Sequence, residues 1–255
     1  TTIGNYSFSG NSLTSVTIPS SLVNIGTYAF DNNRVSMALT LSEGVENIGS
    51  LAFEDANISS IIFPSTIKTI GTFAFRDNYL STLILPEGIT TIGNYSFAEN
   101  SLTAVTIPSS LVNIGTSAFD NNSASMTLTL SEGVENIGST AFQDANISTI
   151  VFPSTITTIE DGAFTDNNLT VLILPEGITS IGNASFSRNA LTSVTIPSSL
   201  VNIGTNAFDN NSVSMTLTLS EGLESIGSTA FQDANISSIV FPSTIPVFIF
   251  WNKFC

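Results

Sequence analysis

The sequence predicts a solenoid in which short coils of chain stack along one axis. Three observations predict it. A motif I-G-x-x-x-F recurs at a fixed short period, and a longer repeat of 89 residues lies above it. The composition combines 42% hydrophobic with only 10% charged residues over 255 positions, so a buried core is expected and wholesale disorder is not. We therefore expect one elongated domain over residues 1–245, built of about eleven repeats.

The short period is carried by phenylalanine. Eleven of the 18 phenylalanines follow one another at intervals of 22 or 23 residues: Phe8, Phe30, Phe53, Phe75, Phe97, Phe119, Phe142, Phe164, Phe186, Phe208 and Phe231. A glycine stands four residues before ten of them, and Glu160 stands in its place before Phe164. A 22-residue unit cannot bury its apolar positions alone, but stacked neighbours can cover them.

The long period is a duplicated block of four repeats. Residues 12–100 match residues 101–189 almost one for one, and Ala190 begins a third copy. The 23-residue members fall at the same place in each block and carry S-M-x-L-T-L-S-E-G around Met37, Met126 and Met215.

Each unit predicts one short strand and one turn. In residues 11–30, the stretch 16–18 (V-T-I) is β-branched and alternates with period two, which predicts a strand that Pro19 ends. Residues 25–30 are too few for a full helix and predict a turn or a single 3₁₀ or α turn. Residues 31–33 (D-N-N) predict the return. Strands of successive units then pair in parallel, about 4.8 Å apart.

Asparagine marks a second recurring position, where a buried amide can satisfy backbone groups of a bend. It lies three residues after the phenylalanine in eight units: Asn11, Asn33, Asn78, Asn100, Asn122, Asn167, Asn189 and Asn211. It lies four residues after in three units, at Asn57, Asn146 and Asn235.

These motifs resemble the BspA-like (Treponema-type) leucine-rich repeat family. Residues 13–19 (L-T-S-V-T-I-P) and 25–30 (I-G-T-Y-A-F) carry the resemblance, which extends over about residues 3–245. It implies a right-handed leucine-rich-repeat solenoid with a concave parallel β-sheet on one face and turns on the other. It also implies a secreted or cell-surface protein, with adhesins that bind host or matrix proteins among the relatives.

Composition excludes several function classes. The net charge is −15, with five Lys plus Arg against 20 Asp plus Glu, which disfavours nucleic acid and anionic membranes as partners. The chain has no histidine, and its one cysteine is Cys255, so Ser-His-Asp and Cys-His catalysis and His or Cys metal sites are excluded. No apolar run is long enough for a transmembrane helix. We expect no enzyme, no cofactor and no membrane insertion.

The candidate binding face is the set of residues that lie between the two core positions of each predicted strand and therefore point outward. It comprises Thr17, Thr40, Ile62, Ile84, Thr106, Thr129, Val151, Ile173, Thr195, Thr218 and Val240. Exposed aliphatic residues on a flat sheet are typical of a partner surface, but Thr, Val and Ile also simply suit strands. Both interpretations remain open from the sequence.

Acidic residues recur with the block at Glu43 and Glu46, at Glu132 and Glu135, and at Glu221 and Glu224, with Asp55, Asp144 and Asp233. Equivalent residues lie four coils apart, roughly 19 Å, and so cannot share one ion or form a catalytic carboxylate pair. A solvated acidic rim is the favoured interpretation, with calcium binding within one loop as the alternative.

Residues 246–255 (P-V-F-I-F-W-N-K-F-C) break the pattern. We interpret them as a frameshifted or truncated reading frame, with a short hydrophobic cap as the alternative. For the whole chain the favoured function is a non-enzymatic protein-binding or adhesion module at the cell surface or outside the cell. A structural spacer or stalk is the alternative, as is recognition of ice or polysaccharide through the threonine rows.

Overall fold

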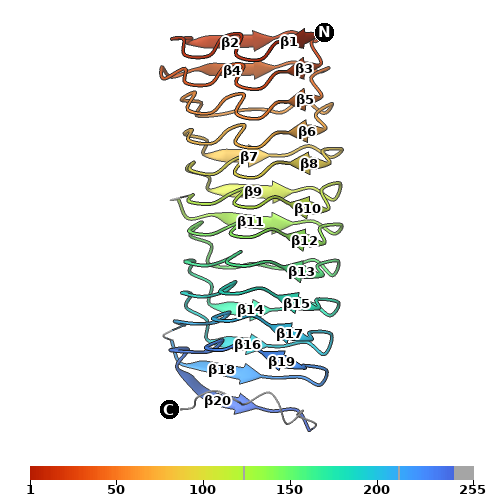
Figure 1. The fold of residues 1–255 in the computed structure, drawn as a ribbon, viewed down its shortest axis with the longest axis vertical. Helices are drawn as coiled ribbons and strands as arrows, with labels where there is room; N and C mark the ends of the chain where they lie inside the picture. The colour runs from red at the N-terminus through yellow and green to blue at the C-terminus, as the bar shows by residue number, and fades with distance from the viewer. Residues whose placement is uncertain (123, 212, 244–255) are drawn as a thin grey trace.

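The computed structural model describes residues 1–122, 124–211 and 213–243, and these residues form a single stack of coils. The strands labelled β1 and β20 lie at opposite ends of the stack, and the chain advances by one coil for each phenylalanine of the repeat (Figure 1). Residues 246–255, which the sequence analysis interprets as a frameshifted or truncated reading frame or a hydrophobic cap, lie outside the described residues.

One side of the stack is a parallel sheet made of the predicted strands, here called the face sheet. It runs in three segments, which are β2–β4, β7–β9–β11 and β14–β16–β18–β20. The strands are β2 (Ser15–Ile18), β4 (Ala38–Leu41), β7 (Thr82–Ile84), β9 (Ala104–Ile107), β11 (Thr127–Leu130), β14 (Val171–Ile173), β16 (Ser193–Thr195), β18 (Met215–Thr218) and β20 (Ile236–Val240). Neighbours pair at the repeat interval, so that Thr106 pairs with Ile84 on one side and Thr129 on the other.

The prediction of a strand in every coil is wrong in two places. Residues 61–63 and 150–152 are not strands, which is why the face sheet is divided. Each of these stretches ends in a phenylalanine where other coils have Ile or Leu. Phe63 points inward and packs edge-on against the stacked rings of Phe75 and Phe97, and Phe152 packs likewise against Phe164 and Phe186.

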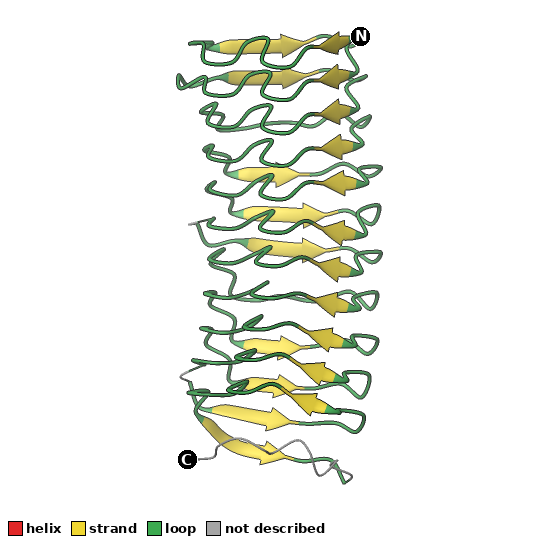
Figure 2. Ribbon diagram, in the orientation of Figure 1, coloured by secondary structure: helices red, strands yellow, loops and turns green. Residues whose placement is uncertain are grey.

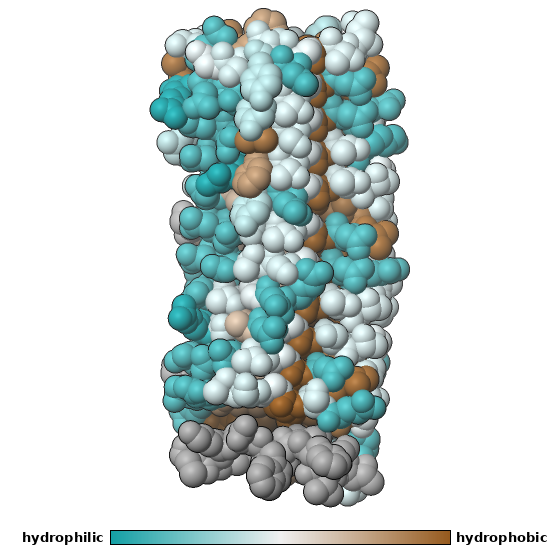
Figure 3. All heavy atoms as spheres, in the orientation of Figure 1, coloured by the Kyte–Doolittle hydropathy of each residue, from teal (hydrophilic) through white to brown (hydrophobic). Residues whose placement is uncertain are grey.

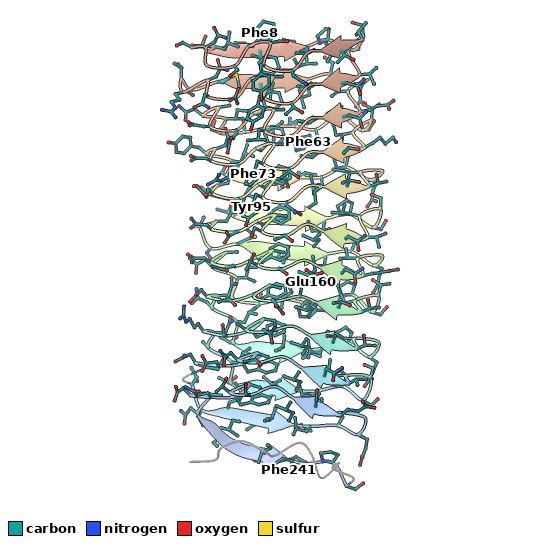
Figure 4. The ribbon with its side chains drawn as sticks, in the orientation of Figure 1. Phe8, Phe63, Phe73, Tyr95, Glu160 and Phe241 are labelled. Carbon is teal, nitrogen blue, oxygen red and sulfur yellow. The ribbon has the colours of Figure 1, made fainter. Side chains whose placement is uncertain are left out.

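The third copy of this sequence shows what the ring does. Phe241 is 40% exposed instead of being inserted in the core, and there the same stretch forms β20. We therefore attribute the two interruptions to the inserted rings of Phe63 and Phe152. Figure 4 shows Phe63 inside the stack and Phe241 at its end.

A second row of parallel strands, which the sequence did not predict, lies beside the first (Figure 2) and is divided between β8 and β10 into sheets of five and six strands. Its strands are two residues long: β1 (Thr2–Ile3), β3 (Asn24–Ile25), β5 (Asn47–Ile48), β6 (Thr69–Ile70), β8 (Thr91–Ile92), β10 (Asn113–Ile114), β12 (Asn136–Ile137), β13 (Thr158–Ile159), β15 (Ser180–Ile181), β17 (Asn202–Ile203) and β19 (Ser225–Ile226). The isoleucine of the motif I-G is the second residue of each strand and points into the core.

The third side of each coil is a pair of turns, and the described residues contain no helix. In every coil two positions of these turns have a left-handed backbone, one two residues before the phenylalanine and one two residues after it. The first series is Tyr6, Tyr28, Leu51, Phe73, Tyr95, Ser117, Thr140, Gly162, Ala184, Asn206 and Thr229, and the second is Gly10, Asn32, Asp55, Asp77, Glu99, Asn121, Asp144, Asp166, Arg188, Asn210 and Asp233.

These turns replace strand pairing with their own ladder of backbone hydrogen bonds. The N–H groups of Tyr28, Phe30 and Asn32 donate to the carbonyls of Ser50, Ala52 and Glu54 in the next coil, at 3.0, 2.8 and 2.9 Å. Consecutive coils are therefore joined on the turn side even where the face sheet is interrupted.

Glycine at a left-handed position is expected to stabilise the protein. Ala184 has φ 52°, a backbone conformation that costs an L-residue about 1–2 kcal/mol. Ala184→Gly is expected to raise the free energy of unfolding by about 0.5–1 kcal/mol, because relief of strain exceeds the entropic cost of glycine. Denaturant unfolding measures it. The matched variant Ala163→Gly, at a buried position without positive φ, is expected to destabilise; stabilisation by both variants would contradict the explanation.

The eleven phenylalanines form one column of stacked rings through the core. Each ring lies over the next with centroids 5.0–5.6 Å apart, from Phe8 to Phe231. The rings from Phe53 to Phe208 are fully buried, whereas Phe8 at the end of the stack is 44% exposed. The prediction of a stacked-repeat core is confirmed.

Seven asparagines form the expected amide ladder. Asn122 accepts a hydrogen bond from the N–H of Leu102 at 3.1 Å and donates to the carbonyls of Phe97 and Phe119 at 3.2 and 2.8 Å, so one side chain joins two coils. Asn33, Asn78, Asn100, Asn167, Asn189 and Asn211 lie buried in the same way. Asn11 is exposed in the first coil.

The three asparagines at the four-residue offset do something different. Asn57, Asn146 and Asn235 have left-handed backbones, with φ of 51°, 56° and 47°, and a buried alanine stands at the ladder position before each. The prediction of one amide role for all eleven positions is therefore wrong for these three, since asparagine is here chosen for its backbone.

Candidate binding face

All eleven residues of the candidate binding face are exposed, as their alternation with core residues predicts. The aliphatic members are the most conspicuous, because Ile62, Ile84, Val151 and Ile173 are 86, 78, 83 and 71% exposed. Ile62 and Val151 lie on the two interruptions of the face sheet, and their outward orientation persists there without strand pairing. The structure thus brings the predicted residues into one row along the stack.

A second outward row lies two residues before the first. It comprises Ser15, Ala38, Ser60, Thr82, Ala104, Thr127, Thr149, Val171, Ser193, Thr216 and Ser238. Neither row contains a charged residue, although the chain carries a net charge of −15. In the view of Figure 3, hydrophilic residues gather along both edges of the stack. A face of hydroxyl and aliphatic side chains costs less free energy to desolvate than a charged face, which suits contact with a macromolecule.

Five glutamates border this face where the strands end. Glu43, Glu87, Glu132, Glu176 and Glu221 each accept hydrogen bonds from the N–H and the hydroxyl of a serine one coil later, namely Ser65, Ser109, Ser154, Ser198 and Ser243. These bonds hold the pKa values of Glu43 and Glu132 below the usual range. The sequence analysis grouped only three of the five; the recurring E-G dipeptide was the signal for the others.

Between β11 and the interrupted stretch that follows it, the face is hollowed into a groove. The cavity measures about 360 Å³, and its lining includes Leu128, Leu130, Val151, Phe152 and Glu132. The groove is continuous with the candidate binding face, because Thr129 and Val151 form two of its walls.

A second acidic series follows the phenylalanine column on the turn side. Asp31, Glu54, Asp77, Glu99 and Asp120 belong to five successive coils there. Among the described residues no group of three or more Asp, Glu, His or Cys is arranged to hold a metal ion. Arg76 pairs with two members of this series, with Glu99 at 2.6 Å and with Glu54 at 3.4 Å.

Asp120 is expected to make folding pH-dependent. Burial, and next the charge of Asp144, raise the pKa of Asp120 from 3.8 to about 6. Because the folded-state pKa is raised, the contribution of this group to stability is complete below about pH 4 and is lost as the pH rises through 6. Asp120→Asn is expected to increase the free energy of unfolding at pH 8 by about 1 kcal/mol, allowing for solvent screening, and to have no effect at pH 4. Denaturant unfolding at both pH values tests this; equal gains at both would contradict it.

The stacked coils, parallel sheet and uncharged outward rows define a leucine-rich-repeat solenoid. The sequence model described as the BspA type leucine rich repeat region matches residues 1–126 and 135–253, in six copies, and the chain belongs to this family. Two solved structures show the same fold at 19% identity. A leucine-rich repeat protein from Bacteroides ovatus aligns with a TM-score of 0.66 over 95% of this chain and 76% of the other. One from Eubacterium ventriosum aligns with a TM-score of 0.54 over 95% and 70%.

No curated protein matches the chain. Within the part of the chain that the structure describes, no helix has the length and apolar character needed to cross a bilayer.

Proposed function

We propose that this chain is a non-enzymatic binding module of a secreted or cell-surface protein, and that the candidate binding face contacts a protein partner. The observation that carries the proposal is the uncharged face itself. Four aliphatic side chains are 71–86% exposed in a row that no charged residue interrupts, on a molecule of net charge −15. Membership of the BspA-type repeat family supports it, as does the in-register strand pairing that aligns neighbouring members of the row.

The proposal predicts that charge on the face prevents binding. Ile84→Glu with Ile173→Glu is expected to weaken binding at least tenfold, because each carboxylate would be desolvated against the partner. The matched control, Thr90→Glu with Thr179→Glu, places the same charges at exposed positions outside the face and is expected to bind like the unchanged chain.

The measurement is biolayer interferometry of the chain against a panel of purified extracellular-matrix and host cell-surface proteins. Binding by the unchanged chain and the control, but not by the face variant, supports the proposal. Equal binding by the face variant contradicts it. Absence of any protein ligand from the panel also contradicts it and favours the spacer. Binding to a polysaccharide array, if it requires the threonines of the face, favours the alternative of ice or polysaccharide recognition.

A further inference from the structure

The groove beside Val151 is caused by the insertion of one side chain, Phe152, into the core. Phe152 inserts between coils and meets Phe164 and Phe186 edge-on at 5.6 and 6.4 Å. The stretch that carries it makes no strand, so β11 is paired only with β9 and its other edge borders the groove. The opening is therefore built by a buried side chain rather than by a flexible loop.

The lining of the groove combines an apolar part with a single charged side chain. Its floor is formed by the carbon side chains of Leu128, Leu130 and Phe152, which are 6–8% exposed. Of the described residues that line it, Glu132 alone is charged, and it is exposed. Each carboxylate oxygen accepts one hydrogen bond from Ser154, at 3.1 and 2.9 Å, which leaves lone pairs available to a further donor.

We propose that this groove takes the side chain of an arginine or lysine presented by a protein partner, with its carbon chain on the apolar floor and its cation at Glu132. The inference rests on the proposed binding function of the face and names the anchor of that partner. Long cationic side chains combine an apolar stem with a charged end, as this lining requires. Arginine is also among the residues that most often dominate interface energetics.

Charge complementarity selects this occupant over an apolar one. The hydrogen bonds from Ser154 lower the pKa of Glu132, so its carboxylate stays ionised at neutral pH. A purely apolar side chain would bring no positive charge to this carboxylate, whose hydrogen bonds come from the uncharged Ser154. The excess of acidic over basic residues, 20 against five, favours approach of a cationic surface.

The probe for the test is N-acetyl-arginine amide, with N-acetyl-citrulline amide as its neutral isostere. Titration into the methyl-labelled full chain is followed by methyl NMR. We expect saturable shifts at Leu128, Leu130 and Val151 with the arginine probe, and at least fivefold weaker binding of the citrulline probe. Raising the salt concentration is expected to lower the affinity for the arginine probe and to leave the affinity for the citrulline probe unchanged.

Two variants locate the site. Glu132→Gln is expected to reduce affinity for the arginine probe to that of the citrulline probe. Glu176→Gln is the matched control: Glu176 makes the same contacts with Ser198, but β14 and β16 pair there, so the variant is expected to leave probe binding unchanged. Phe152→Leu is expected to restore strand pairing, close the groove and abolish probe binding while the chain stays folded.

Equal binding of the two probes, shifts confined to other residues, or equal loss in the two glutamine variants would each overturn the anchor. The proposed function of the whole face is tested by a different result from the one that tests the anchor. A chain that does not bind the probe but loses a protein partner on Ile84→Glu with Ile173→Glu has a binding face without this anchor.

Discussion

Phe119→Ala is expected to lower the free energy of unfolding by about 4–5 kcal/mol. The ring is fully buried and stacks on Phe97 and Phe142, with centroids 5.6 and 5.2 Å away. Truncation removes its buried surface, leaves a cavity and breaks two ring contacts at once, and the first two effects alone cost 3–5 kcal/mol in packed cores. Because each coil contacts only its neighbours, the loss should also weaken the coupling between the two halves of the stack.

Denaturant unfolding followed by circular dichroism measures both effects. The expected signature is a lower midpoint together with a broader transition. Phe8→Ala is the matched control, because Phe8 is 44% exposed and stacks on only one ring. Phe8→Ala should lower the free energy of unfolding by well under half as much as Phe119→Ala. Equal losses for the two variants would contradict a continuous ring column.

Gly93→Ala is expected to destabilise the protein by at least about 3 kcal/mol, although it adds only a methyl group. A Cβ at this position would lie 2.4 Å from the nitrogen of Thr72 and 2.6 Å from the carbonyl carbon of Gly71. Those atoms belong to the backbone of the preceding coil and cannot move without breaking its ladder, so the strain exceeds ordinary overpacking.

Gly4→Ala is the control for this effect. It occupies the same place in the first coil, and its Cβ would meet only the Ser7 hydroxyl oxygen, at 3.3 Å. It should be tolerated, and thermal unfolding of the two variants tests the comparison. A Gly93→Ala protein as stable as the unchanged chain would show that coils are spaced more widely than the structure places them.

Much of the fold was predictable because residues that repeat at a fixed interval occupy equivalent places in every coil. The phenylalanine period predicted the number of coils, and the alternation around Thr17 and Thr106 predicted which residues face outward. Glu160, which replaces the glycine that the other ten repeats have four residues before the phenylalanine, could not be explained from the sequence. Its coil instead places Gly162 at a left-handed position, with φ 65°, and the Glu160 carboxylate accepts hydrogen bonds from the N–H and hydroxyl of Ser139 at 2.8 and 2.9 Å (Figure 4).

The rest depended on three-dimensional context. Alternation alone predicts a strand at Val151 as well as at Thr129, because it does not show that Phe152 reaches between two rings of the neighbouring coils. The two-residue strands that lie beside the face sheet are too short to give a periodic signal. The groove follows from the first of these facts, so the residues of the face, and not its hollow, could be predicted.

The most direct test of the stacked-coil account is a pair of cysteines on the face. Thr106 and Thr129 are 23 residues apart in sequence but are paired across β9 and β11, at the roughly 4.8 Å spacing of neighbouring strands, which a disulfide can span. In a Cys255→Ser background, Thr106→Cys with Thr129→Cys is expected to form an intramolecular disulfide under mild oxidation. Thr17→Cys with Thr106→Cys, four coils and roughly 19 Å apart, is expected to stay reduced. A reduced first pair, or a crosslinked second pair, would contradict the stack.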